Sequence, residues 1–191
     1  MILKPFKQFS ANNITQGFHQ YHKAIDILPI RKGGLAYGTP LVAPERCKIG
    51  KVYTPQFFKD NPHDDAPVKN GYGLFMKGLE TGYLHLYWHT QPVFPVSTGD
   101  MVERGAIVAY CGNSGNVFSG GLYVPISERN LPNFKGTHLH QVLIDDRETP
   151  QRGTVLNPLD YMDIVTEPTY TIFDELKAIS TTLLKISKLL S

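Results

Sequence analysis

Four histidines and one aspartate stand in three short clusters along the chain: His22 with Asp26, His89 alone, and His138 with His140. A catalytic zinc site takes three protein ligands, imidazole nitrogens and a carboxylate oxygen among them, and keeps its fourth position for water. Zinc lowers the pKa of that water toward about 7 and polarises a carbonyl group. The set therefore predicts a site for one Zn²⁺ ion and hydrolytic chemistry.

The spacing within two of the clusters adds geometry. His138 and His140 are two residues apart, so in a strand both rings enter the same space while Leu139 turns to the core. One ring can then bind the metal while the other transfers a proton. The four-residue spacing of His22 and Asp26 fits an irregular loop that runs into a strand as well as it fits a helical turn.

A single histidine is more often a surface residue or a hydrogen-bonded core residue than a metal ligand. We expect this of the remaining three, His19, His63 and His85. Coincidence is a poorer explanation for the three clusters, because each of them falls at the edge of a predicted strand.

Short runs rich in β-branched and aromatic residues alternate with glycine and proline, which number 17 and 14. This pattern predicts a mainly β domain. The predicted strands are 40–43, 48–53, 73–77, 82–89, 106–111 and 138–144, separated by turn signals at 31–34, 69–71, 97–100 and 112–116.

The predicted strand 82–89 alternates two kinds of side chain. Simple alternation places one set, His85, Tyr87 and His89, on the face of a groove. It places the other set, Leu84, Leu86 and Trp88, on the face of the core. Such a strand would be a rigid mount for a site.

Two polar segments interrupt the strands. The segment 57–70 clusters Asp, Asn and Pro and is predicted to be an exposed loop. The segment 118–135 is a long connection just before His138, and long connections are often functional. The sequence leaves open whether it forms a wall of the substrate groove or a surface insertion.

The end of the chain has a different period. Apolar residues recur at steps of four and three between Ile172 and Leu190, which predicts an amphipathic helix. We therefore expect a peptidase domain at 1–167 and a C-terminal helix at 168–191. Packing of the helix on its own domain remains open against a role as an anchor, in self-association or in docking to a larger assembly.

Composition sets the wider limits. The 191 residues, 41% of them hydrophobic, are enough for one buried core. The net charge of +2 is scattered, so no nucleic-acid partner is expected. The N-terminus lacks the apolar core of a secretory signal, and no stretch is long enough to predict a membrane span. Cys47 and Cys111 are too few for a disulfide framework and are expected to be two buried, small apolar side chains.

Together these residues resemble the lysostaphin-type zinc endopeptidases of bacterial cell walls, from about Ile14 to Pro158. The resemblance rests on motifs taken in order along the chain. These are His22-x-x-x-Asp26, Gly38-Thr-Pro-Leu-Val-Ala-Pro44, Gly50-Lys-Val52, Tyr87-Trp-His89, Gly99-Asp-Met-Val-Glu-Arg-Gly105, Gly112-Asn-Ser-Gly115 and Gly136-Thr-His138-Leu-His140. As an ordered set they are specific.

The resemblance implies a compact antiparallel β-sheet of barrel-sandwich type, with the metal on the floor of a groove. It implies that His22, Asp26 and His140 bind the zinc and that His89 and His138 are catalytic. It also implies a substrate class, the peptides that cross-link peptidoglycan. The sequence does not assign which of the two catalytic histidines is the base, but the clusters hold no spare carboxylate for that role.

Three positions depart from the family pattern. Ala24 stands where glycine is usual, which is tolerated if its φ is negative. Gln141 and Val142 follow His140 where an aromatic residue and an acid are common. These two neighbour a ligand and are expected to affect how it is oriented.

Other functions remain as alternatives. An inactive relative that binds peptidoglycan, or a structural tail subunit of the same fold, would share the motifs, although such members generally lack ligands. A biotinyl or lipoyl carrier domain would share the turn 99–105, but its lysine hairpin would come before the Ala-Pro turn. Without a signal peptide, a phage product suits the chain, either virion-associated or released at lysis to act on the wall.

Overall fold

The computed structural model describes residues 1–7, 9–29, 36–63, 69–130, 134–147 and 153–162. The predicted C-terminal helix and the domain boundary at 167/168 lie outside these residues, so both stay predictions. No helix in the described ranges combines the length and the hydropathy that a membrane crossing requires.

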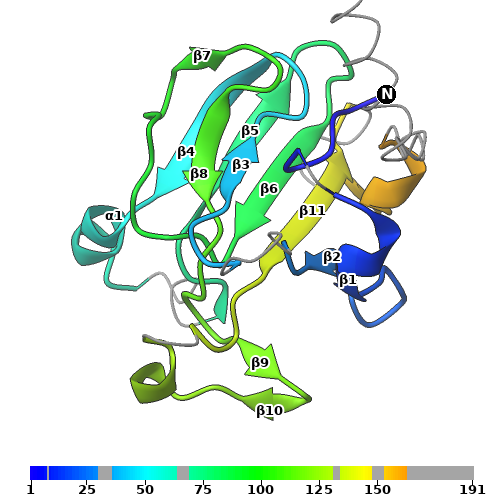
Figure 1. The fold of residues 1–191 in the computed structure, drawn as a ribbon. Coiled ribbons are helices and arrows are strands. Elements are labelled where there is room, and N and C mark those ends of the chain that lie inside the picture. Colours follow the sequence, from blue (N-terminus) through cyan, green and yellow to red (C-terminus); the bar gives the residue numbers. More distant parts are fainter. Residues whose placement is uncertain (8, 30–35, 64–68, 131–133, 148–152, 163–191) are drawn as a thin grey trace, which may run out of the picture.

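The described residues form one large antiparallel sheet of eight strands and two small two-stranded sheets (Figure 1). The large sheet has the order β1 (Ile14–Gln16), β2 (Ile25–Ile27), β11 (Leu139–Asp145), β6 (Leu84–Trp88), β5 (Gly73–Gly78), β4 (Cys47–Tyr53) and β7 (Met101–Val102), with β12 (Thr154–Leu156) paired to β11. The small sheets are β3 (Pro40–Val42) with β8 (Ile107–Tyr110), and β9 (Phe118–Ser119) with β10 (Leu122–Tyr123). The prediction of a mainly β, antiparallel fold is confirmed.

All six predicted strands are present, with ends shifted by at most a few residues. The strands that the sequence did not predict, such as β1 and β2, are two or three residues long, too short to show an alternation. The predicted loop at 57–70 is wrong at its start, because α1 spans Pro55–Asp60. Thr54 caps this helix by accepting a hydrogen bond from the backbone of Phe57 at 3.0 Å, and proline occupies the first turn. Three short 3₁₀ turns cover Ala11–Asn13, Ile126–Glu128 and Pro158–Asp160.

The core lies on one face of the large sheet, where β3, β8 and the N-terminal segment cover it. Strand β11 shows how the sequence builds this layer. Leu139, Gln141 and Leu143 are fully buried, whereas His140 and Val142 are only half-buried on the open face. Each buried leucine contributes roughly 1.5–3 kcal/mol, so this face fixes the register of the strand.

The prediction for the faces of β6 is wrong. His85 and Tyr87 are fully buried in the core, and Leu84 and Leu86 lie half-buried on the opposite face. One polar atom of each buried ring has a partner. His85 Nε2 lies 2.9 Å from a carboxylate oxygen of Glu45, and the Tyr87 hydroxyl donates to the backbone carbonyl of Val42 at 3.0 Å. A ring with a polar atom can therefore occupy the core face where the chain supplies a partner.

Glu45 is the centre of a buried polar network. Its carboxylate accepts hydrogen bonds from the backbone of Glu80 and Thr81, both at 2.9 Å, and from the Thr81 hydroxyl at 2.6 Å. Burial raises the pKa of Glu45, but the hydrogen bonds from His85 and Thr81 lower it more, so the pKa of Glu45 falls to about 2. The other histidines expected to be ordinary, His19 and His63, are exposed.

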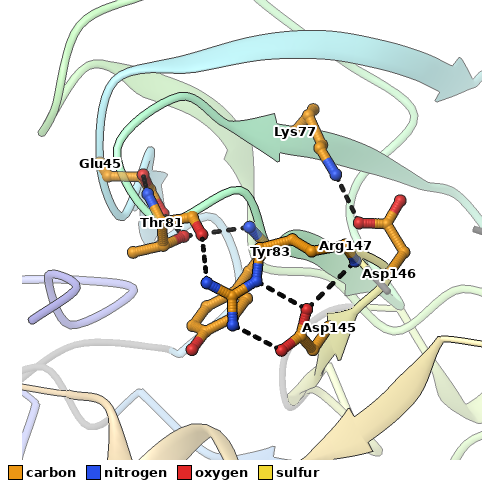
Figure 2. Close-up of polar contacts among 7 residues, drawn as sticks. All are labelled: Glu45, Lys77, Thr81, Tyr83, Asp145, Asp146 and Arg147. Atoms are coloured by element: carbon orange, nitrogen blue, oxygen red, sulfur yellow. Dashed lines mark hydrogen bonds and ion pairs between the residues drawn. The ribbon is translucent and has the colours of Figure 1, made fainter. Parts of the chain in front are cut away.

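Two ion pairs lie near this network (Figure 2). Lys77 contacts Asp146, and Arg147 binds Asp145 at 2.7 Å and lies over the ring of Tyr83. All of these groups are at the end of β5, β6 and β11 where Leu84 pairs with Ile144. His140 pairs with Trp88 at the other end, about 13 Å along the strand, so the network and the three histidine clusters occupy opposite ends of the sheet.

Candidate metal centre

Strands β2 and β11 bring together two of the three predicted ligands, Asp26 and His140. Asp26 pairs directly with His140 across the sheet. Ile25 and Ile27 point to the core, so Asp26 points to the open face, where His140 also lies. The result is a contact of 2.8 Å between His140 Nδ1 and Asp26 Oδ1.

His22 reaches the same place from the turn between β1 and β2. The backbones of His19 and His22 exchange two hydrogen bonds, at 3.0 and 3.1 Å, which closes the turn. His22 Nδ1 donates to the carbonyl of Gly17 at 3.1 Å, so Nε2 carries the free lone pair. This Nε2 lies 3.3 Å from Asp26 Oδ1. The spacing of His22 and Asp26 fitted either a loop that runs into a strand or a helical turn. The structure has the first arrangement, with His22 in a turn and Asp26 in the following strand.

The three side chains fit a zinc ion. One donor atom from each of His22, Asp26 and His140 lies within 4.8 Å of the other two. Ligands placed tetrahedrally at about 2.0–2.1 Å from one ion are about 3.4 Å apart, close to the 3.3 Å between His22 and Asp26. The side chains are 14%, 14% and 24% exposed, so a substrate can reach them.

The charge of Asp26 also supports a zinc site. Burial raises the pKa of Asp26, but the hydrogen bond with His140 and the nearby His138 and His22 lower it more, so its net pKa is below the usual value. Asp26 is therefore ionised at neutral pH. Two imidazoles and one ionised carboxylate match the ligand set of a catalytic zinc site.

His138 stands beside this group, one residue before β11. Its Nδ1 donates to the carbonyl of Gly136 at 2.9 Å, and its Nε2 lies 4.0 Å from Asp26 Oδ2. Gly136 has a φ of +79°, and a Cβ atom there would be 2.6 Å from Val117. Only glycine fits such a turn, so the Gly-Thr-His motif has a structural reason.

His89 owes its position to an unusual backbone conformation. Strand β6 ends at Trp88, and His89 has a φ of +60°, in the left-handed region. Its ring consequently leaves the alternation of the strand and lies 4.6 Å, centroid to centroid, from that of His138. The ring is held there by its Nδ1, which donates to the carbonyl of Ser114 at 2.8 Å. Strained residues of this kind often cluster at functional sites.

The loop Gly112–Gly115 is the support of His89. Ser114 Oγ accepts a hydrogen bond from the backbone of Tyr72 at 2.9 Å and donates to the carbonyl of Thr90 at 2.8 Å. Gly115 has a φ of +72°, and a Cβ atom there would lie 2.3 Å from the backbone nitrogen of Gly71. The sequence showed this motif, but its role in orienting His89 is visible only in the structure.

The two histidines each keep one ring nitrogen free. Burial, with the neighbouring His138 and His140, lowers the pKa of His89 to about 3. Burial is also the main reason that the pKa of His138 lies below its usual value. Both rings are thus neutral at pH 7, and because Nδ1 of each donates to a carbonyl, Nε2 of each is free to accept a proton.

All five residues singled out in the sequence therefore lie in one site. Of the departures, Ala24 is buried and is not among the described non-glycine residues with positive φ, His89 and Phe134. Gln141 is fully buried, and neither atom of its amide has a hydrogen-bond partner. Cys47 and Cys111 are buried, as expected, and neither forms a disulfide bond.

No family model matches the chain, and no curated protein matches it. Solved structures do. The antimicrobial peptidase lysostaphin from Staphylococcus simulans matches with 17% identity over 83% of this chain and 54% of its own, at a TM-score of 0.54. The catalytic domain of the prophage-encoded M23 protein EnpA from Enterococcus faecalis matches with 18% identity over 82% and 97%, at a TM-score of 0.50.

A zinc-containing peptidase from Vibrio cholerae also matches, with 17% identity over 81% of this chain and 39% of its own, at a TM-score of 0.50. The chain thus spans about half of lysostaphin and less of the Vibrio protein. At identities this low, the structural similarity establishes the architecture alone: the chain has the fold of the lysostaphin-type M23 peptidases.

Proposed function

We propose that the chain belongs to the lysostaphin-type family and is a zinc-dependent endopeptidase that hydrolyses the peptide cross-links of bacterial peptidoglycan. One observation carries the proposal: on a fold shared with M23 peptidases, the donor atoms of His22, Asp26 and His140 converge within 4.8 Å. His89 and His138 lie beside them, as a hydrolytic site requires.

In this proposal His22, Asp26 and His140 hold one zinc ion. A bound zinc would supply Lewis acidity toward a peptide carbonyl and would make a water molecule more acidic. The carbonyl of Gly17 keeps Nε2 of His22 available by accepting a hydrogen bond from Nδ1. Such partners outside the ligand set orient ligands and raise metal affinity.

In this proposal His89 and His138 transfer protons during hydrolysis. Each can accept one at Nε2, because its Nδ1 is committed to the carbonyl of Ser114 or Gly136. One imidazole takes a proton from the attacking water at Nε2 and passes it to the leaving amide nitrogen. The other would donate a hydrogen bond from Nε2 to the developing oxyanion in its protonated form, with that proton taken from solvent. The rings are close enough to serve one substrate carbonyl, and the two roles are interchangeable in this geometry.

The place of action is also a proposal. We propose that the chain is a bacteriophage product that reaches the wall on the virion or by release at lysis. The support is the similar fold of a prophage-encoded protein. Docking or self-association through the predicted C-terminal helix belongs to the same proposal, and loss of particle association on deletion of 171–191 would test it.

Digestion of purified peptidoglycan tests the activity. We expect soluble fragments, identified by mass spectrometry as products of peptide-bond cleavage, and no release in the presence of a chelator. Restoration of cleavage by added zinc would separate metal removal from damage to the protein. If binding to peptidoglycan persisted without any cleavage, the chain would be an inactive relative of the same fold.

A further inference from the structure

The segment between Val117 and Thr137 is built onto the site. It contains the hairpin β9–β10, which lies at the end of the sheet where β6 stops and β11 begins (Figure 1). Arg129, only 8% exposed, donates to the backbone carbonyls of Val124, Asn113 and Gly115. The Asn113 amide donates in turn to the carbonyl of Arg129 at 2.9 Å. The segment is thereby fastened to the loop that supports His89.

A groove of about 780 Å³ separates this segment from β1. Asp26 and His138 are among its lining residues, so the groove is continuous with the candidate metal centre. Its volume lies within the range of ligand sites. Residues of β1, Thr15 and Gln16, form one wall, and β1 is an edge strand of the described sheet. An extended peptide can pair with such an edge through its backbone.

An aromatic pair, Tyr37 and Phe134, also lines the groove. Tyr37, from the loop before β3, stacks on Phe134 with ring centroids 4.1 Å apart and an interplanar angle of 10°. Phe134 has a φ of +41°, which is unusual for a bulky residue. Phe118, 56% exposed, also lines the groove. Two segments far apart in the chain thus present apolar rings to the same space.

The polarity of the groove lining limits the chemical class of ligand that it could bind. Apart from the metal centre, the described residues of the groove carry one charged side chain, Lys135, and it is paired with Glu128 at 2.7 Å. Gly120 and Gly121 form the turn of the hairpin and leave open space beside their backbones. The described lining is therefore matched to backbone and apolar side chains.

We propose that Tyr37, Phe134 and Phe118 form a specificity subsite for an uncharged aliphatic side chain of an extended peptide substrate. The inference rests on the proposed peptidase function and adds to it a preference beside the scissile bond. A glycine at that position of the substrate leaves the rings without a contact.

Cleavage of a peptide series tests the subsite. The probes are pentaglycine and five variants of it, each with one leucine at a different position. We expect leucine at one position to raise kcat/KM about tenfold or more, through KM, because an apolar pocket discriminates side chains by 10- to 200-fold. Phe134→Asn removes the ring and keeps a residue that tolerates positive φ. It should abolish the preference, so that in this variant the leucine peptide and pentaglycine are cleaved with kcat/KM values within twofold of each other.

Leu122→Ser is the matched control. Leu122 is 75% exposed on the same hairpin and does not line the groove, so this change should keep the full leucine preference. An enzyme that digests peptidoglycan but prefers leucine at no position, or keeps its preference in Phe134→Asn, would overturn the subsite alone. Failure of the wild type to digest peptidoglycan at all would remove the proposed function and the subsite with it.

Discussion

The Nδ1 atom of His89 lies 2.8 Å from the carbonyl oxygen of Ser114, so a residue 25 positions away in the sequence orients this imidazole. The hydroxyl of Ser114 in turn holds the backbones of Tyr72 and Thr90, which flank the site. The position of a candidate catalytic group is thus set by a loop whose described hydrogen bonds reach none of the three candidate metal ligands. This separation makes positioning and metal binding testable one at a time.

The first prediction concerns Ser114→Ala. The change removes two hydrogen bonds and leaves the part-buried backbone N–H of Tyr72 without its partner, so we expect a loss of about 1–3 kcal/mol in the free energy of unfolding. Peptidoglycan cleavage should fall tenfold or more, while zinc content stays the same. Ser97→Ala, at an exposed serine, is the control. Full activity of Ser114→Ala would show that His89 needs no such support.

The second prediction uses the left-handed backbone of His89. His89→Ala and His89→Gly both remove the ring, and both should abolish cleavage while retaining zinc. Glycine adopts a φ of +60° without strain, whereas alanine does not, so His89→Gly should be about 1 kcal/mol more stable than His89→Ala in chemical denaturation. An alanine variant as stable as the glycine variant would mean that the conformation carries no strain.

The third prediction is the acid stability of the Glu45 network. The pKa of Glu45 is about 2 in the folded protein against an unperturbed 4.5, so the ionised carboxylate stabilises the fold above pH 4.5. That contribution, on the order of 3 kcal/mol, is lost as the pH falls from 4.5 to 2. Glu45→Gln should lower stability at pH 7 and flatten its dependence on pH in this window. Equal slopes in the variant and the wild type would refute the assignment.

The fourth prediction concerns the fully buried Gln141, whose amide has no hydrogen-bond partner. Replacing it with methionine keeps a similar shape and removes the desolvated polar group, so Gln141→Met should stabilise the fold by about 1–2 kcal/mol. Zinc affinity should be unchanged, because the side chain points away from His140. Destabilisation by Gln141→Met would indicate that the amide is satisfied in solution.

Local patterns were sufficient to predict part of this architecture. The His138-Leu-His140 unit gave the correct faces of β11, because Leu139 is apolar and buries fully. The same rule failed for β6. His85 can face the core because Glu45, 40 residues earlier in the chain, supplies a partner for its ring. Alternation within one strand cannot reveal such a partner.

The site was predictable in composition but not in arrangement. Residue types and the order of the motifs identified all five side chains. The left-handed conformation of His89 depends on tertiary contacts, among them the bond from its backbone to the carbonyl of Asn70. The stack of Tyr37 on Phe134 joins two loops that carry no shared sequence signal. Contacts between distant segments therefore supplied what the sequence lacked.

Zinc stoichiometry tests the central claim most directly. After removal of bound metal, calorimetric titration with zinc should show one ion per wild-type chain and one per chain of His138→Ala. His140→Ala should lose this binding, because it removes one of the three converging ligands. A wild-type protein that binds no zinc, or a His140→Ala variant that binds it as tightly as the wild type, would contradict the account.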